Sequence, residues 1–325
     1  MTKTNLITGF LGSGKTTTIL HLLAQKPENE TWAVLVNEFG EVGIDGALLA
    51  DSGALLKEIP GGCMCCVNGL PMQVGLNTLL RKGKPDRLLI EPTGLGHPKQ
   101  ILDMLRAEVY QPWLELQATL CLLDARQLLD PRIVQNENFL SQLAAADIIV
   151  ANKADRLEPE SQQALARWQE NEAEGRQVIQ AVQGAIDWHW LNQPGLNQRS
   201  LSSSDGHSHA PSRSQGLAAL KLTGSQRWQR HINHGQGYEA CGWIFDSDTV
   251  FNTVELLEFA RLAPVGRLKA VMRIPEGTLR LNRQGEDFHI ETLATPPADS
   301  RIEVIHHAPA DWNALQSRLL RLRLV

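Results

Sequence analysis

Short, almost wholly apolar runs alternate with longer stretches of helical spacing along the first 185 or so residues. An apolar run without polar alternation is typical of a strand covered on both faces, as in a parallel sheet with helical crossovers. The pattern therefore predicts an α/β domain. Its expected strands are residues 6–8, 32–36, 87–90, 119–123, 148–151 and the more weakly patterned 178–179, and its expected first helix is 16–24.

The pattern changes near residue 192. Between 192 and 215 Ser, Gly and Pro dominate and large apolar side chains are scarce, which predicts a flexible linker between domains of residues 1–191 and 216–325. The last segment mixes strands and helices, as a smaller α+β domain does. Its expected strands are 217–222, 242–245, 268–274, 279–282, 288–292 and 301–305, and its expected helices are 251–262 and 311–322, the latter beginning with Asp311 as N-cap.

Composition then restricts the class of protein. The 325 residues include 42% hydrophobic ones, enough for ordinary buried cores in roughly two domains. Lys and Arg total 31 against 36 Asp and Glu, and this net charge of -5 argues against nucleic acid as an obligatory partner. The chain has no apolar run of about 18 residues and no signal-like start, so we expect a cytoplasmic protein without a membrane partner.

The loop after the first strand has the sequence of a phosphate-binding loop. Residues 9–16 are G-F-L-G-S-G-K-T, which fits G-x-x-x-x-G-K-T between a predicted strand and a predicted helix. The glycines let backbone N–H groups turn toward phosphate oxygens, and the helix adds its positive N-terminal end. Lys15 would bind the β and γ phosphates, and the Thr16 hydroxyl would ligate Mg²⁺. The predicted nucleotide-binding residues here are Gly9, Gly12, Ser13, Gly14, Lys15, Thr16 and Thr17.

A second motif indicates which base is bound. Asn152-Lys153-Ala154-Asp155 is an N-K-x-D sequence directly after an apolar strand. The carboxylate of Asp155 can accept hydrogen bonds from the N1–H and N2–H₂ groups of guanine, a pair of donors that adenine lacks. Asn152 would orient the loop, and the aliphatic part of Lys153 would pack on the base. Four residues occur often by chance, but their place in a phosphate-loop domain favours guanine.

An acid at a strand end supplies the candidate for magnesium and water. The strand 87–90 leads into Glu91-Pro92-Thr93-Gly94, and Glu91 stands where many phosphate-loop GTPases have Asp. Glu91 would hold Mg²⁺ through water or polarise the attacking water, and Gly94 would offer its N–H to the γ-phosphate. Residues 94–98 are then the expected second switch, with His97 close enough to sense the site. Asp124 is an alternative acid whose position fits a strand-end cap better.

Three of the five cysteines lie within four positions. Cys63, Cys65 and Cys66 follow two glycines, and this odd, crowded set does not fit a disulfide framework. Thiolates are soft ligands that favour Zn²⁺, Cu(I) or an iron–sulfur centre, and a fourth ligand must come from elsewhere. Water, a second copy of the chain, or Glu38 or Glu41 of the expected first switch would supply it. The alternatives are a redox sensor and buried structural cysteines.

The phosphate loop, N-E-F-G-E, G-G-C-x-C-C, E-x-x-G and N-K-x-D occur in the order found in the CobW-type metallochaperone GTPases, which the chain resembles over nearly its full length. The resemblance implies a phosphate-loop GTPase domain followed by a CobW-type C-terminal domain. It also implies slow GTP hydrolysis modulated by Zn²⁺ and delivery of metal to a client protein. By position, the implied zinc ligands are Cys63, Cys65, Cys66 and Glu41.

Two features depart from this family's pattern. Val36 stands where some relatives have a Glu immediately before N-E-F-G, so a site that uses that Glu is not expected here. Many relatives have a long His-rich stretch near the domain junction, where this chain has only His207 and His209. These two histidines are more simply explained by a solvated linker, and a large zinc-storage role is not expected.

The expected activity is therefore GTP hydrolysis coupled to zinc binding and to zinc delivery. The predicted catalytic residues are Lys15, Thr16, Glu91 and Gly94, and the cofactors are GTP, Mg²⁺ and Zn²⁺. The expected partners are the nucleotide, the zinc ion, an unidentified client metalloprotein and further copies of the chain in a homo-oligomer. Two alternatives stay open: a GTP-dependent regulatory switch with a structural zinc, and a redox-sensing GTPase. A small-molecule kinase is disfavoured because it would not need Asp155.

Overall fold

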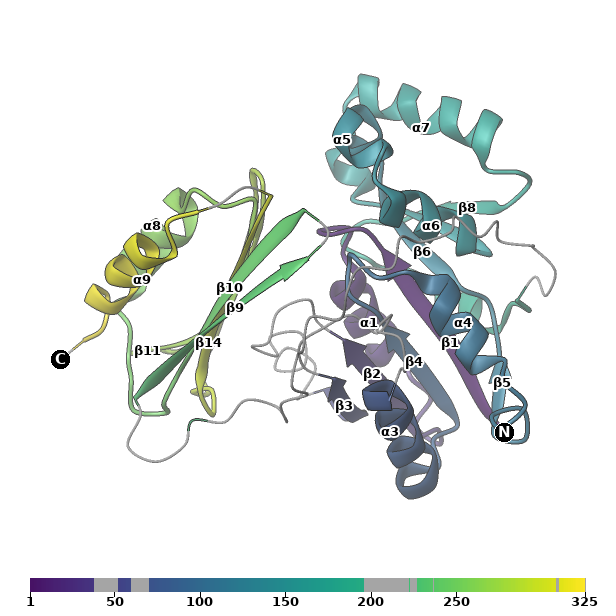
Figure 1. The fold of residues 1–325 in the computed structure, drawn as a ribbon, viewed down its shortest axis with the longest axis horizontal. Coiled ribbons are helices and arrows are strands. Elements are labelled where there is room, and N and C mark those ends of the chain that lie inside the picture. Colours follow the sequence, from purple (N-terminus) through teal and green to yellow (C-terminus); the bar gives the residue numbers. More distant parts are fainter. Residues whose placement is uncertain are drawn as a thin grey trace. The chain divides into compact units, whose positions relative to one another are not determined.

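The computed structural model describes residues 1–37, 52–59, 70–195, 222, 227–235, 237–307 and 310–324. These residues form two compact units, one containing those up to 195 and the other those from 222 onward (Figure 1). Most of the expected linker and of the expected strand at 217–222 lies outside the described residues. The domain boundaries given above therefore remain predictions.

The first unit is built on an eight-stranded sheet in the order β3-β2-β4-β1-β6-β7-β8, with the short β5 also paired to β1. All the pairings between these strands are parallel. Every strand expected in this part of the chain is present, whereas β3 and β5 were not predicted. The strands are β1 (Thr2–Gly9), β2 (Trp32–Asn37), β3 (Leu55–Ile59), β4 (Arg87–Glu91), β5 (Leu114–Leu116), β6 (Leu120–Asp124), β7 (Ile148–Asn152) and β8 (Gln177–Gln180).

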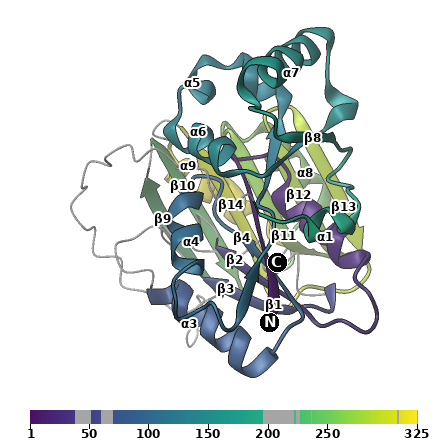
Figure 2. The same ribbon diagram turned by 90° about the vertical axis from the view of Figure 1, so that its right-hand side faces the viewer.

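Helices cover both faces of this sheet, which explains why its strands are apolar on both faces. Successive residues alternate between two cores: Leu6 packs with residues of α3, α4 and α6, and Ile7 packs with residues of α1. Figure 2 shows α3 and α4 on one side of the sheet and α1 on the other. The helices are α1 (Lys15–Ala24), α3 (Leu70–Thr78), α4 (Pro98–Leu105), α5 (Pro131–Val134), α6 (Glu137–Ala145) and α7 (Pro159–Glu172). Shorter helical turns are η2 (Leu79–Gly83), η3 (Ala125–Leu129), η4 (Ala154–Arg156) and η5 (Trp188–Asn192).

The strand order places the candidate residues at one edge of the sheet. β2, β3 and β4 follow β1 on one side of it, whereas the later strands β6, β7 and β8 lie on its other side, so the strand order reverses at β1. In such sheets ligands bind beyond the carboxyl ends of the strands, at the point where the order reverses. Glu91 ends β4, Asp124 ends β6 and Asn152 ends β7, all at the edge where β1 leads into the phosphate loop.

A buried arginine stabilises the opposite end of the sheet, where the strands begin. Arg87 is only 1% exposed, and its guanidinium donates to Asn5 Oδ1 at 2.7 Å and to the Leu191 carbonyl at 3.2 Å. It also donates to the Asn192 side chain and lies over the Trp32 ring, 5.2 Å from the ring centroid. Arg87 thus connects β4 and β1 to the last turn of the first unit.

Replacing Arg87 with Met should lower the free energy of unfolding by about 3 kcal/mol, because it leaves buried amide and carbonyl groups without their charged donor. Urea denaturation followed by tryptophan fluorescence measures this change. The exposed Arg167 on α7 provides the control, since Arg167→Met should change stability by less than about 0.5 kcal/mol. An equal effect of the two substitutions would contradict the assignment.

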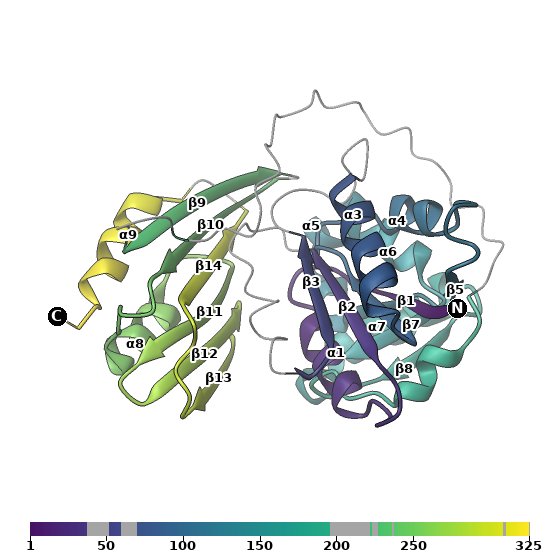
Figure 3. The ribbon, with the colours of Figure 1, turned by 90° about the horizontal axis from the view of Figure 1, so that it is seen from below.

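The second unit is the smaller α+β domain that the sequence predicts. Its six-stranded antiparallel sheet has the order β13-β12-β11-β14-β10-β9, and α8 and α9 pack on one face (Figure 3). Asn252 and Asp311 accept hydrogen bonds from the first turns of these helices, so the expected N-cap at Asp311 is confirmed. The elements are β9 (Trp228–Gly235), β10 (Tyr238–Phe245), α8 (Thr253–Leu262), β11 (Arg267–Ile274), β12 (Gly277–Gln284), β13 (Asp287–Leu293), β14 (Ser300–His306) and α9 (Trp312–Arg321). None of the helices described in either unit is long and apolar enough to cross a membrane.

Candidate functional site

The phosphate loop is folded tightly between β1 and α1. Gly9 and Gly14 have φ values of 143° and 100°, which L side chains rarely adopt. A Cβ atom on Gly9 would lie 2.5 Å from the Leu122 carbonyl oxygen, and one on Gly14 would lie 2.3 Å from Asn152 Nδ2. Lys15 Nζ donates to the Gly9 carbonyl at 3.0 Å, so its charge is held within the curve of the loop. This arrangement suits an anionic phosphate.

Thr16 and Glu91 meet at the end of this loop. The Thr16 hydroxyl donates to Glu91 Oε1 at 2.9 Å, and both side chains are buried. A hydroxyl and a carboxylate oxygen beside a phosphate loop are the hard ligands that Mg²⁺ prefers. The two residues therefore fit the magnesium site expected of them, with the metal neutralising charge on the β and γ phosphates when it is bound.

The segment after β4 forms a compact turn against the phosphate loop. The Thr93 hydroxyl accepts from Leu95 N at 3.1 Å, and the Thr93 carbonyl accepts from Gly96 N at 2.9 Å. A Cβ atom on Gly94 would lie 2.9 Å from Leu11 N, so Gly94 can approach the loop this closely only because it has no side chain. His97 precedes α4, and burial lowers the pKa of its imidazole while Glu137 partly opposes that shift.

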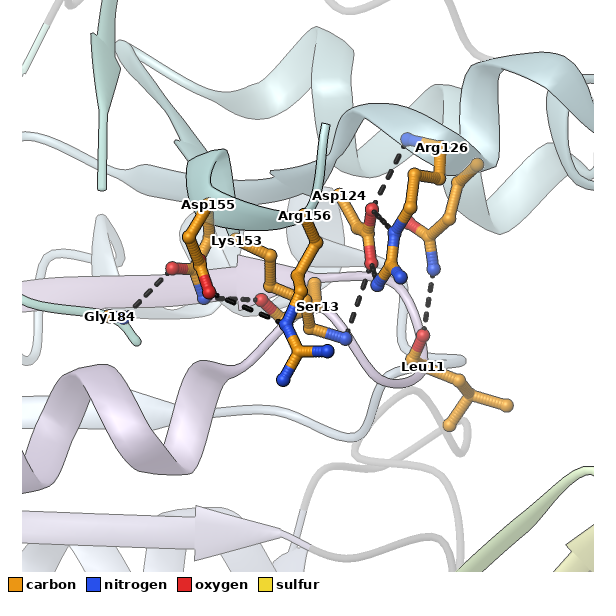
Figure 4. A network of polar contacts seen from close by, with 10 residues as sticks. Leu11, Ser13, Asp124, Arg126, Lys153, Asp155, Arg156 and Gly184 are labelled. Carbon is orange, nitrogen blue, oxygen red and sulfur yellow. Dashed lines mark hydrogen bonds and ion pairs between the residues drawn. The ribbon is translucent and has the colours of Figure 1, made fainter. Parts of the chain in front are cut away.

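Asn152 joins the N-K-x-D loop to the phosphate loop. Its Nδ2 donates to the Ser13 carbonyl at 2.9 Å, and its Oδ1 accepts from Gly184 N at 2.8 Å (Figure 4). The buried amide therefore fixes three chain segments with respect to one another, as a residue that orients the base-binding loop must do. The loop 181–185, which includes Gly184, was not singled out from the sequence.

Lys153 and Asp124 form an ion pair beside this loop. Lys153 has a φ of 59°, and its Nζ lies 3.2 Å from Asp124 Oδ2 (Figure 4). Asp124 also accepts from Arg126 N at 3.2 Å, so its predicted role as a strand-end cap is confirmed. Holding the ammonium in this way leaves the aliphatic part of Lys153 beside the loop.

Asp155 lies in η4 with its side chain 38% exposed, and its nearest cation is Arg156, whose Nε is 3.4 Å from Asp155 Oδ2. A partly exposed carboxylate with a single, exposed ion-pair partner can still accept two hydrogen bonds from a base edge. This geometry suits the guanine-binding role expected of Asp155, which remains a prediction.

Two buried glutamines near the phosphate loop escaped the sequence analysis. Gln127 Nε2 donates to the Leu11 carbonyl at 2.9 Å, and Gln142 Nε2 donates to the carbonyls of Gly94 and Gly96 at 3.0 and 3.1 Å. A single glutamine on a helix has no local sequence signal that separates it from a solvated residue. Only the folded chain reveals that both side chains hold backbone groups of the site.

The proposed zinc ligands lie outside the described residues. These are Cys63, Cys65, Cys66 and Glu41, and His207 and His209 lie outside them as well. The two cysteines that are described, Cys121 and Cys241, are buried, and burial raises the pKa of each thiol to about 12, which keeps both protonated at neutral pH. Within the described ranges, no group of three or more His, Cys, Asp or Glu side chains is placed to hold a metal ion.

Comparison with known proteins gives the chain a family. Residues 3–180 match the CobW/HypB/UreG nucleotide-binding domain. The chain is 70% identical over 324 residues to the zinc chaperone YeiR of Escherichia coli (strain K12), covering 100% of this chain and 99% of that protein. It is 36% identical over 156 residues to the zinc chaperone YjiA of the same strain, covering 46% of this chain and 48% of that one.

Among solved structures, the Zn(II)-bound YjiA GTPase from E. coli matches the chain at 20% identity and a TM-score of 0.46 over 99% of both chains. The family expected from the order of the motifs is thus confirmed, and so is the fold class of a phosphate-loop α/β domain with a second, α+β domain. The chain belongs to the CobW/HypB/UreG family of nucleotide-binding proteins.

Proposed function

We propose that this chain is a zinc chaperone that binds and hydrolyses GTP and uses the nucleotide to control delivery of zinc to a client protein. The observation that supports this function most is the 70% identity, over essentially the whole of both chains, to a protein named as a zinc chaperone. The geometry of the phosphate loop and the N-K-x-D loop supports the nucleotide part of the proposal independently.

In this proposal the nucleotide site uses groups that the fold already holds in place. Lys15 and the backbone N–H groups of the loop bind the phosphates, and Asp155 binds the guanine edge. Thr16 and Glu91, which lie within hydrogen-bonding distance of each other, would hold Mg²⁺, and Glu91 would orient the attacking water. The N–H of Gly94 binds the γ-phosphate, so the turn that contains Gly94 distinguishes GTP from GDP.

Zinc is the cargo in this scheme. We assign its binding to the thiolates of Cys63, Cys65 and Cys66 with Glu41 as an oxygen ligand, a donor set that suits a tetrahedral Zn²⁺. If GTP changes the affinity for zinc, then zinc must change the affinity for GTP by the same factor. Transfer to the client then follows from a lower zinc affinity in one nucleotide state.

The test is zinc affinity measured by competition with a chromophoric chelator, in the presence of GDP or a non-hydrolysable GTP analogue. We expect a tight site in the wild-type chain whose affinity differs roughly tenfold between the nucleotides, within the usual range of such couplings. Cys65→Ala should abolish the site. Cys241→Ala, which removes a buried, protonated thiol in the second unit, should leave it unchanged.

Each other result would overturn the proposal. Equal zinc affinity with both nucleotides would indicate a regulatory GTPase with a structural zinc. In that case Cys65→Ala should also lower the stability of the folded chain. Absence of a zinc site that depends on Cys65 would indicate that the cysteine cluster is a redox sensor.

A further inference from the structure

The side chain of Gln142 braces the turn that follows β4. It extends from α6, is only 1% exposed, and its Nε2 donates to the carbonyls of Gly94 and Gly96 at 3.0 and 3.1 Å. A carboxamide nitrogen has two N–H groups, and here both are used on backbone oxygens of one turn. Gln142 is thus bonded to the segment rather than to solvent or to its own helix.

The braced turn is held to the nucleotide site at two further points. Glu91, just before the turn, accepts from the Thr16 hydroxyl at 2.9 Å. Gly94 packs directly against the backbone of Leu11 in the phosphate loop. A shift that moves the carbonyls of Gly94 and Gly96 therefore breaks their hydrogen bonds from Gln142 or moves α6 with the turn.

A brace matters here because glycines give this turn backbone freedom, even though Thr93 closes it with two hydrogen bonds. Two of the three residues from 94 to 96 are glycines, the residue type with the greatest backbone freedom. Without an outside anchor, the peptide groups around Gly94 would sample several orientations, and only some would aim its N–H at a phosphate. When a group that positions the reactants is misplaced by roughly 1 Å, the rate of the catalysed reaction can fall by up to about a hundredfold.

We propose that Gln142 is a positioning residue for GTP hydrolysis, which fixes the turn at Gly94 in the orientation that binds the γ-phosphate. This inference rests on the proposed GTPase function. When the γ-phosphate is lost, Gly94 loses its hydrogen bond to the nucleotide. The two hydrogen bonds from Gln142 then limit how far the turn moves away from the phosphate loop. Gln142 therefore affects GTP binding and hydrolysis, which involve the γ-phosphate, and does not affect GDP binding.

Gln127 provides the matched comparison. It is another buried glutamine, but it donates to the Leu11 carbonyl in the phosphate loop at 2.9 Å. The phosphate loop surrounds the β-phosphate, which GDP and GTP share. Removing the Gln127 amide should therefore weaken the binding of both nucleotides by a similar factor, whereas removing the Gln142 amide should affect only steps that involve the γ-phosphate.

The experiment uses the full chain with Gln142→Met and Gln127→Met, since Met has nearly the same length and lacks the donor. For Gln142→Met we expect kcat for GTP hydrolysis to fall roughly ten- to a hundredfold, with GDP affinity within about twofold of wild type and weaker binding of a non-hydrolysable GTP analogue. For Gln127→Met we expect both affinities to fall together. A purely structural role of Gln142 would instead lower GDP and analogue affinity equally, and that result would overturn the inference.

Hydrogen exchange of the backbone amides at 94–97 provides a second measurement. With the GTP analogue bound, these amides should exchange faster in Gln142→Met than in the wild-type chain, and equal exchange rates in the two chains would overturn the inference. The two proposals fail in different ways. A wild-type chain that hydrolyses no GTP would remove the proposed function and this inference together, whereas a wild-type chain whose hydrolysis survives in Gln142→Met would remove this inference alone.

Discussion

Gly14→Ala is expected to weaken binding of GDP and of GTP roughly a hundredfold. The new Cβ would lie 2.3 Å from Asn152 Nδ2, and the φ of 100° at this position is strained for any residue with a side chain. Asn152 would have to move, which breaks its hydrogen bonds to the Ser13 carbonyl and to Gly184 N. Strain and two lost hydrogen bonds together amount to about 3 kcal/mol, which corresponds to that factor in affinity.

Titration with a fluorescent GDP measures this effect, and the thermal unfolding midpoint reports whether the variant remains folded. Gly175→Ala is the matched control, because Gly175 also has a positive φ, of 76°, but a Cβ there would have no atom within 4 Å. The control suffers the backbone strain without the collision and lies outside the nucleotide loops. Equal GDP affinity in the two variants would contradict the role assigned to the contact between Gly14 and Asn152.

The parts of the fold that the sequence predicts are those with a strong local signal. The apolar runs at β1, β2, β4, β6 and β7 are buried on both faces, so their composition alone indicates strands of a parallel sheet. Since the phosphate loop follows one of these strands and Glu91 ends another, their meeting at one sheet edge was foreseeable. The hydrogen bond between Thr16 and Glu91 joins two residues that this reasoning places at the same end of the sheet.

The parts that escaped prediction depend on contacts between distant segments. β9 has the sequence W-Q-R-H-I-N-H-G, and as an edge strand it carries too many polar side chains to be distinguished from a loop. Gln142 contacts residues 46 and 48 positions away, and Gln127 contacts one 116 positions away. No periodicity or motif encodes such pairs, because they exist only once the sheet has brought α6 and η3 beside the phosphate loop.

Asp155→Asn should change which base the chain binds. Guanine presents two donors, N1–H and N2–H₂, to the carboxylate, whereas the Asn carboxamide offers one acceptor and one donor. One guanine donor would then face another donor, and we expect GTP affinity to fall roughly a thousandfold, since sites built to pair with a given polar group discriminate strongly against a mismatch. Xanthine has a carbonyl in place of the guanine amino group, so its N1–H and that carbonyl complement the Asn side chain.

Competition of GTP and xanthosine triphosphate against a fluorescent nucleotide tests this reversal of preference. The ordering of the loop by Asn152 does not involve Asp155, and Arg156 is its only ion-pair partner among the described residues, so the substitution should leave the phosphate loop and the fold intact. Asp248→Asn, at an exposed position of the second unit, controls for the change in charge. Unchanged preference for GTP in Asp155→Asn would mean that other residues recognise the base. If Asp155 does contact guanine, the substitution replaces one acceptor oxygen with a donor NH₂ group and must weaken that contact.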